Sequence, residues 1–149
     1  MLLNSTNTAY TGHPTLPEKP FSSVGEIVAP SVAQLRSRGR GGLPPRALRS
    51  VREFIEAHLE ETITIQSLAA TAGLSMYHFA RAFKQSEGVA PHHYLVRRRV
   101  RRAQNLLATT DLPLSEIALA AGFADQSHCA RRFREHVGVT PSSYRWSVR

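Results

Sequence analysis

The chain has 149 residues, of which 42% are hydrophobic and 20% are charged, and its formal net charge is +8. This length suits one small domain with a tail, and the ordinary glycine and proline contents exclude collagen-like, coiled-coil and wholly disordered proteins. The excess of basic residues predicts an anionic partner: nucleic acid first, an acidic membrane surface second and an acidic small substrate third.

The first 43 residues differ in composition from the rest of the chain. Of the 18 glycines and prolines, 11 lie in residues 1–45, and polar, turn-forming runs such as residues 36–42 have no sustained apolar period. A segment of this kind cannot offset the entropy that is lost on ordering. We therefore expect residues 1–43 to form a mostly disordered, flexible N-terminal arm or linker, and residues 44–149 to form the folded domain.

Helical patterns begin at Pro45, a residue that suits the first turn of a helix. The apolar positions of this first helix are three or four residues apart, as one buried face requires: Leu48, Val51, Ile55 and Leu59. A second helix is expected to begin after Thr64, whose side chain can cap it, and to end at Gly73.

A third helix is expected after the turn at Gly73, with Ser75 as its N-cap and Gly88 at its end. Phe79 and Phe83 are four residues apart and predict its buried face. A long fourth helix is then expected from Pro91 to about Thr109. Its apolar stripe consists of Val96, Val100, Ala103 and Leu107.

The remaining sequence repeats the first part at a shift of 49 or 50 positions, a change of one that reflects an extra residue in the second turn. The matches include Leu68 with Ile117, Gly73 with Gly122, His78 with His128, Arg81 with Arg131, Phe83 with Phe133 and Tyr94 with Tyr144. An internal repeat indicates a repeated structural unit. The predicted fold class is therefore all-α, with two tandem helix-turn-helix units joined by a long linker helix and about seven helices in total.

A helix, a short turn containing glycine and a second helix is the arrangement that places a recognition helix in the DNA major groove. The second helix of each unit has an apolar edge that we expect to face inward: Phe79, Ala82 and Phe83 in the first, Cys129 and Phe133 in the second. Arginine can donate two hydrogen bonds to guanine, and glutamine matches the edge of adenine.

Residues 40–145 resemble the DNA-binding domain of the AraC/XylS family of bacterial transcription regulators. The similarity is densest in residues 73–84, 94–99, 116–133 and 138–145. In that family the two recognition helices enter successive major-groove segments on one face of the duplex. Carried over position by position, the resemblance implies that these residues read bases: Tyr77, Ala80, Arg81, Gln126, Ser127, Ala130 and Arg131.

Six further positions on or beside these helices are expected to contact phosphates: Ser75, His78, Lys84, His128, Arg132 and Arg134. Two residues depart from the family pattern. Cys129 stands where an aromatic residue is usual, so the second unit is expected to pack more loosely. Ala90 stands where a capping serine is common and where the second copy has Thr140, so the long helix is expected to lose roughly 1 kcal/mol of capping energy.

The arginines of residues 97–102 wrap around the long helix, so they cannot all face one groove. Cys129 is the only cysteine, which excludes an internal disulfide, and no further ligand stands at metal spacing from it and His128. We therefore expect no metal and no other cofactor. No apolar run approaches the roughly 18 residues that span a bilayer, and no cationic stretch followed by an apolar one opens the chain.

The expected function is that of a sequence-specific transcription regulator, an activator or a repressor, with double-stranded DNA and RNA polymerase as partners. We expect one chain to bind its site as a monomer, in the bacterial cytoplasm at the nucleoid, without a membrane partner. No paired carboxylates, phosphate-binding loop or nucleophile elbow occurs, so no enzymatic activity is expected. Two alternatives remain open: a helical protein-interaction module, and the C-terminal part of a longer effector-responsive regulator.

Overall fold

A computed structural model describes residues 41–149, which contain seven α-helices and no strand. The helices are α3 (Pro45–Ala57), α4 (Ile65–Ala72), α5 (Met76–Glu87), α6 (Pro91–Thr109), α7 (Leu114–Ala120), α8 (Gln126–Val137) and α9 (Pro141–Val148). The predicted all-α class and the order of the helices are confirmed. The predicted arm lies outside the described residues, apart from its last three.

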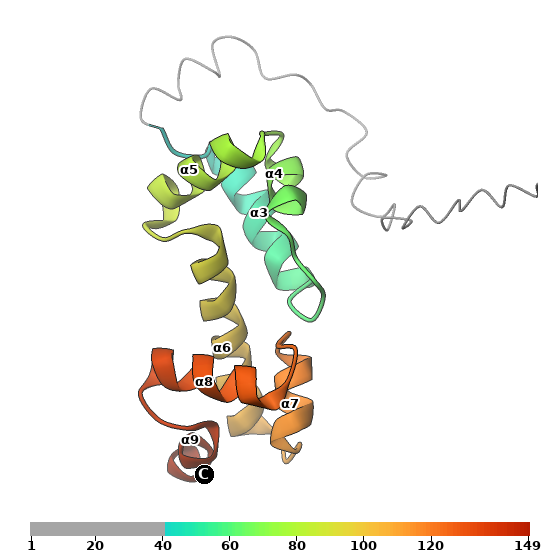
Figure 1. Cartoon of the computed structure of the whole chain (residues 1–149), viewed down its shortest axis with the longest axis vertical. Coiled ribbons are helices and arrows are strands. Elements are labelled where there is room, and N and C mark those ends of the chain that lie inside the picture. The colour runs from blue at the N-terminus through green and yellow to red at the C-terminus, as the bar shows by residue number, and fades with distance from the viewer. Residues whose placement is uncertain (1–40) are drawn as a thin grey trace, which may run out of the picture.

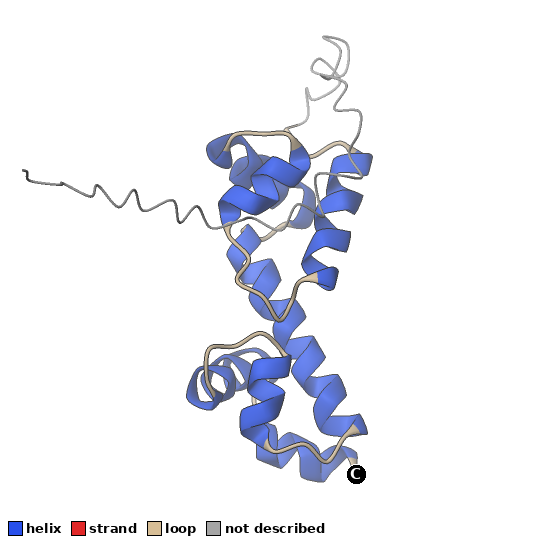
Figure 2. Cartoon of the chain, turned by 90° about the vertical axis from the view of Figure 1, so that its right-hand side faces the viewer, coloured by secondary structure: helices blue, strands red, loops and turns tan. Residues whose placement is uncertain are grey.

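Two small helical bundles lie one above the other and are joined by α6 (Figures 1 and 2). The first unit comprises α3, α4, α5 and the start of α6, and the second unit comprises the rest of α6 with α7, α8 and α9. Each unit has its own apolar core, with Phe79 and Phe83 at the centre of the first and Phe133 in the second. The helix α6 belongs to both cores, because Leu95 packs in the first and Val96 in the second.

The helix starts follow the capping residues that the sequence predicts. The Thr64 side chain accepts from the backbone N–H of Ser67, whose hydroxyl in turn accepts from the N–H of Thr64. Ser75 caps α5. As expected from the repeat, Thr140 caps α9, whereas Ala90 gives α6 no side-chain cap. The N–H groups in the first turn of α6 therefore have no side-chain acceptor at the cap position.

The folded part begins before residue 44, the predicted start of the domain. Leu43 is only 7% exposed and packs in the first core, and its N–H donates to the Ser86 hydroxyl over 2.8 Å. The prediction put Leu43 in the arm because a single apolar residue between glycines and prolines carries no periodic signal. Its burial depends on residues that lie far along the chain.

Three arginines of the run at residues 97–102 bind the linker helix to the end of α3 and to the turn that follows it. Arg98 bonds Glu56 over 2.5 Å, and Arg102 pairs with Glu60. Arg99 donates to the backbone carbonyls of Leu59, over 3.1 Å, and Glu61, over 2.7 Å. These contacts fix the direction in which α6 leaves the first unit.

The second unit touches the same place through its turn. Gly122 has a φ of +93°, and its backbone faces the carbonyl of Leu59 so closely that an added Cβ would lie 1.8 Å from that oxygen. Arg99 lies beside the same contact. The carbonyl of Leu59 is thus a point at which the first unit, the linker helix and the second unit meet.

Candidate nucleic-acid interface

The two predicted recognition helices, α5 and α8, lie on the same side of the molecule, one in each bundle (Figures 1 and 2). Each begins with a side-chain cap, Ser75 for α5 and Asp125 for α8, and each ends at a glycine. Of the predicted inward positions, Phe79, Phe83, Cys129 and Phe133 are buried, and Ala82 is half-buried against the first core. The opposite faces of both helices are therefore left to solvent.

The structure places the predicted base-reading residues on these two outer faces. Tyr77 is 70% exposed, and Arg81, Gln126, Ser127 and Arg131 are also exposed. Ala80 and Ala130 are half-buried. Because the two helices repeat one another, Arg81 of α5 and Arg131 of α8 stand at matching positions, each the sixth residue of its helix.

The residues predicted to contact phosphates divide into two groups. Lys84 and Arg134 are exposed in the last turns of α5 and α8, and neither forms an ion pair within residues 41–149. The other four already have partners in the protein. They are Ser75 and His78, which bond each other over 2.9 Å, His128, whose ring lies edge-on to Phe123, and Arg132, which bonds Glu135 over 2.9 Å.

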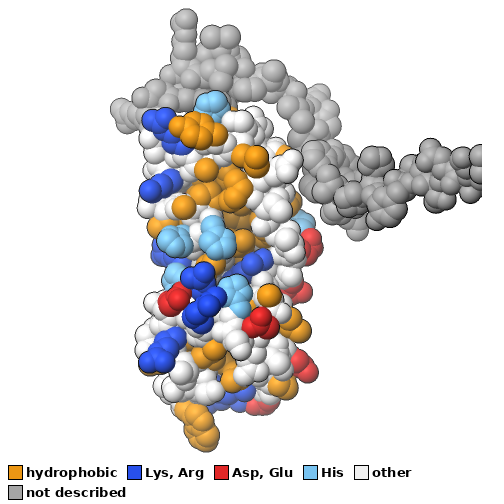
Figure 3. All heavy atoms as spheres, viewed as in Figure 1, with side chains coloured by type: hydrophobic (Ala, Val, Ile, Leu, Met, Phe, Trp, Pro, Cys, Tyr) orange, Lys and Arg blue, Asp and Glu red, His pale blue; other side chains and the backbone are white. Residues whose placement is uncertain are grey.

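A group of cationic and titratable side chains lies between the two recognition helices, and the sequence did not predict it as a group. We call it the junction cluster: His92, His93 and Arg99 of α6 with His128 and Arg132 of α8. Burial first, and then the charges of Arg132, His93, Arg99 and His128, lower the pKa of His92. Figure 3 shows histidines and basic side chains gathered at mid-height on this face.

The position of the junction cluster suits an anion. His92 and His93 lie in the uncapped first turn of α6, whose N–H groups and dipole favour negative charge. No spacing in the sequence relates residue 92 to residue 132, so periodicity could not find the cluster. The available signal was a pair of histidines directly after a proline at a helix start.

The rest of the arginine run faces elsewhere. Arg97 and Arg101 are exposed and line an open groove together with Gln104, His136 and the C-terminal end of α5. The run is thus divided between contacts with α3 and exposed positions, as its wrapping around the helix predicts. Trp146, whose place the sequence did not decide, is 86% exposed on α9.

Cys129 is buried, and burial raises the pKa of its thiol from 9.0 to about 11. At about pH 8 the folded protein therefore holds about 100-fold fewer thiolates than an unfolded chain does. We expect iodoacetamide to alkylate Cys129 far more slowly in the native protein than in denaturant, as followed by intact mass. Equal rates in the two states would contradict this burial.

Within residues 41–149, no three histidine, cysteine or acidic side chains lie close enough together to bind a metal ion. None of the described helices is both long enough and apolar enough to cross a bilayer. The chemistry available on the exposed face is that of hydrogen-bond donors and positive charge.

Comparison with known proteins gives one family. The profile of the helix-turn-helix domain matches residues 68–147. Over 99 residues the chain is 34% identical to the probable transcriptional regulator LumQ of Photobacterium leiognathi, a match that covers 66% of this chain and 40% of LumQ. It is also 34% identical over 94 residues to the transcriptional activator AarP of Providencia stuartii, covering 63% of this chain and 70% of AarP.

Solved structures agree with these sequence matches. An AraC-type DNA-binding regulator from Chromobacterium violaceum has a TM-score of 0.66 and 31% identity, covering 69% of this chain and 92% of that one. The DNA-binding domain of AdpA, solved in complex with a target DNA, has a TM-score of 0.65 and 35% identity, covering 68% and 91%. The chain spans 40% of the length of LumQ and of the regulatory protein PocR of Salmonella typhimurium.

Proposed function

Because this chain belongs to the family of AraC-type helix-turn-helix DNA-binding domains, we propose that it is a sequence-specific transcription regulator. It inserts α5 and α8 into successive major-groove segments of a promoter site. The observation that carries this proposal is the placement of two recognition helices, with Arg81 and Arg131 at matching exposed positions, on one side of a chain of charge +8. The AdpA complex with a target DNA supports it.

The outward residues of the two helices divide the work of recognition. Arg81 and Arg131 donate to guanine edges, and Gln126 suits adenine. Tyr77, Ser127 and the methyl groups of Ala80 and Ala130 complete the surface presented to the bases. Lys84 and Arg134 pair with phosphates, as do Ser75, His78, His128 and Arg132 after their present contacts rearrange.

The junction cluster contacts the backbone between the two major-groove segments. It lies between the recognition helices, where the phosphates of an intervening minor groove pass a protein that binds one face of the duplex. His92 and Arg132 carry donors there, and the first turn of α6 adds backbone N–H groups.

A single chain holds both recognition helices, so the proposal includes a monomer on DNA. The linker α6 has 19 residues and a length of about 28 Å, which is comparable to the roughly 34 Å helical turn that separates half-sites of paired helix-turn-helix units. The outward residues of α5 and α8 differ, so the two halves of the site differ in sequence and no palindrome results.

Selection from random duplexes tests this function. We expect one enriched, asymmetric site, an affinity that falls steeply between about 50 and about 200 mM salt, and one chain per duplex by mass on the shortest site with full affinity. Binding without sequence preference would favour the protein-interaction module. Two chains on a symmetric site would overturn the monomer and leave the DNA-binding function standing.

The pH dependence of binding tests the junction cluster. The surroundings lower the pKa of His92 in the free protein, and a phosphate that arrives beside the ring favours its protonated form. The complex then holds more protons than the free protein does, so affinity must rise as pH falls from about 7.5 to about 6. We expect this rise in titrations of the selected site at constant ionic strength.

Two substitutions at the same position separate the charge of His92 from its shape. The change His92→Asn keeps a polar side chain without a titrating charge and should flatten the pH profile at the lower affinity. His92→Arg carries a permanent charge and should flatten it at the higher affinity. A pH profile that both variants leave unchanged would show that His92 is not the source of the effect.

We also propose RNA polymerase as a second partner and the bacterial nucleoid as the place of action. Relatives of this chain are named transcriptional activators, including AarP and NphR of Rhodococcus, which supports activation through RNA polymerase as a second partner. LumQ, PocR and AarP are bacterial regulators, which supports a place at the nucleoid in the bacterial cytoplasm and a role other than catalysis.

A further inference from the structure

The two recognition helices differ in one buried side chain. Phe79 of α5 is fully buried, and Cys129, its counterpart in the repeat, is 2% exposed at the matching position of α8. One neighbouring aromatic contact is alike in both units. Phe83 meets Tyr94 edge-on at 5.3 Å between ring centroids, and Phe133 meets Tyr144 in the same way at 5.4 Å. The second unit therefore lacks a ring at the position that Phe79 fills in the first, although Phe123 adds a buried ring elsewhere in its core.

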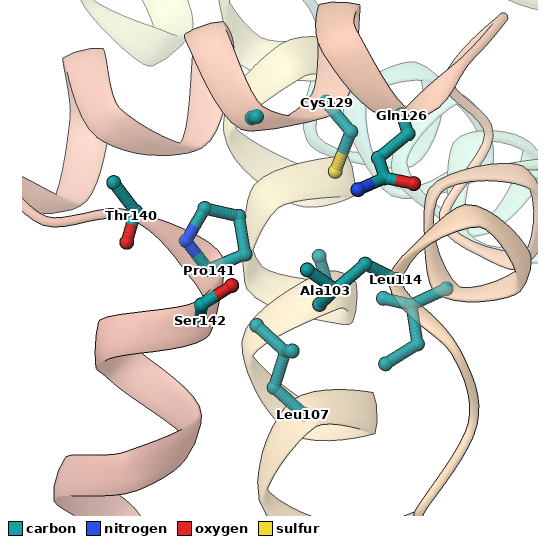
Figure 4. A pocket seen from close by; sticks show the side chains of 10 residues that line it. Ala103, Leu107, Leu114, Gln126, Cys129, Thr140, Pro141 and Ser142 are labelled. Carbon is teal, nitrogen blue, oxygen red and sulfur yellow. The ribbon is translucent and has the colours of Figure 1, made fainter.

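A pocket of about 130 Å³ lies beside this missing ring, among α6, α7, α8 and α9. Figure 4 shows the sulfur of Cys129 directed into it, above Ala103 and Leu107 of α6. Its inner wall is apolar, with Leu114 and Ile117 beside the two α6 residues. Its mouth is polar and open to solvent, and carries the side chains of Gln126, Thr140 and Ser142.

We propose that this pocket is a binding site for a small molecule with a single aromatic ring and at most one hydrogen-bonding group. The volume of about 130 Å³ is close to that of an apolar cavity of about 150 Å³ that binds benzene, so it suits a single small ring. The wall offers apolar contacts, and the thiol of Cys129 stays neutral and adds no charge. The amide of Gln126 and the hydroxyl of Ser142 at the mouth suit one polar substituent, such as a phenolic hydroxyl.

The occupant of this site would act on DNA binding. Gln126 and Ala130 line the pocket and also belong to the base-reading face of α8. A bound ring fills space that packing leaves empty and so stabilises the position of α8. We expect phenol to increase the affinity for the selected site, a consequence that rests on the proposed function.

Benzene and phenol are the probes, and methyl groups report where they bind. In the intact chain we expect saturable shifts in the methyl NMR signals of Ala103, Leu107, Ile117 and Ala130, with those of Val51 and Leu68 in the first unit unchanged. Shifts spread over both units, or shifts that grow without saturation, would overturn the site. This measurement needs no variant.

Two substitutions at one position then test the missing ring. Cys129→Phe places at position 129 the side chain that Phe79 has in the first unit, and should weaken benzene binding by roughly tenfold or more. Cys129→Ala leaves the pocket open and should keep benzene binding unchanged. Equal binding by both variants would overturn the assignment. If benzene binds the pocket but phenol leaves DNA affinity unchanged, the effector role fails alone. If no duplex binds at all, the proposed function fails while the ligand site stands.

Discussion

Replacing Gly122 by alanine is expected to lower the free energy of unfolding by about 3 kcal/mol, well beyond the same change at Gly73. Both glycines stand in the turn of a helix-turn-helix unit and both have positive φ, +93° and +67°. A Cβ at Gly73 would meet nothing within 4 Å, so only the left-handed backbone opposes it, at about 1–2 kcal/mol. A Cβ at Gly122 would lie 1.8 Å from the carbonyl oxygen of Leu59.

The added Cβ at position 122 would clash with a backbone atom, the carbonyl oxygen of Leu59. A backbone atom cannot rotate away from a clash as the end of a flexible side chain can. Relief requires that the turn of the second unit move off the end of α3, and overpacking of this kind costs about 1–3 kcal/mol. Denaturant unfolding of the two single variants measures the difference. Because the movement also separates the units, Gly122→Ala should weaken binding to the selected duplex more than Gly73→Ala does. Equal losses of stability in the two variants would show that the units do not rest on each other at Leu59.

Replacing Arg131 by alanine is expected to cost about 1–3 kcal/mol of binding to the best site, a loss of roughly 5- to 150-fold in affinity. Arg131 is exposed at the middle of α8, where its guanidinium can donate two hydrogen bonds to guanine. Arg81→Ala in α5 should have an effect of similar size. Each substitution should relax the preference at a different base pair, because the two helices read different segments.

Arg134 supplies the matched control for this prediction. It is also an exposed arginine of α8, but it lies in the last turn, where we assign it to a phosphate. Arg134→Ala should lower the affinity for all DNA sequences by the same factor. It should also reduce the slope of affinity against salt concentration by the amount that about one phosphate contact contributes. Affinities for every single-base variant of the site provide the comparison. If the base preferences of the Arg131 and Arg134 variants changed in the same way, the division into base and phosphate contacts would be wrong.

Local signals account for what could be predicted from the sequence. Thr64 and Ser75 cap helices through their own side chains, and Gly88 ends one through its backbone, so the boundaries depend only on near neighbours. The repeat then carried these assignments from the first unit to the second. The inward and outward faces of α5 and α8 follow from the helical period alone.

The features that could not be predicted join residues that are distant in sequence. Arg99 donates to the carbonyl of Leu59, and the charge of Arg132 lowers the pKa of His92, only because α6 joins the two units. Leu43 is buried for the same kind of reason. The resemblance to the family marked Cys129 as standing where an aromatic residue is usual, and looser packing of the second unit stays a prediction. The pocket beside Cys129 could not be predicted, because it depends on how four helices are placed.

The sharing of α6 between the two cores has a consequence for how the protein unfolds. Leu95 and Val96 are adjacent, yet one packs in each core, so neither unit can release this helix without exposing apolar surface of the other. Loss of structure is then cooperative across both units, in a single transition. A substitution that weakens the core of one unit thereby lowers the stability of the other. Sequence change is tolerated most readily on the outer faces of α5 and α8, where a new operator can be acquired without loss of the fold.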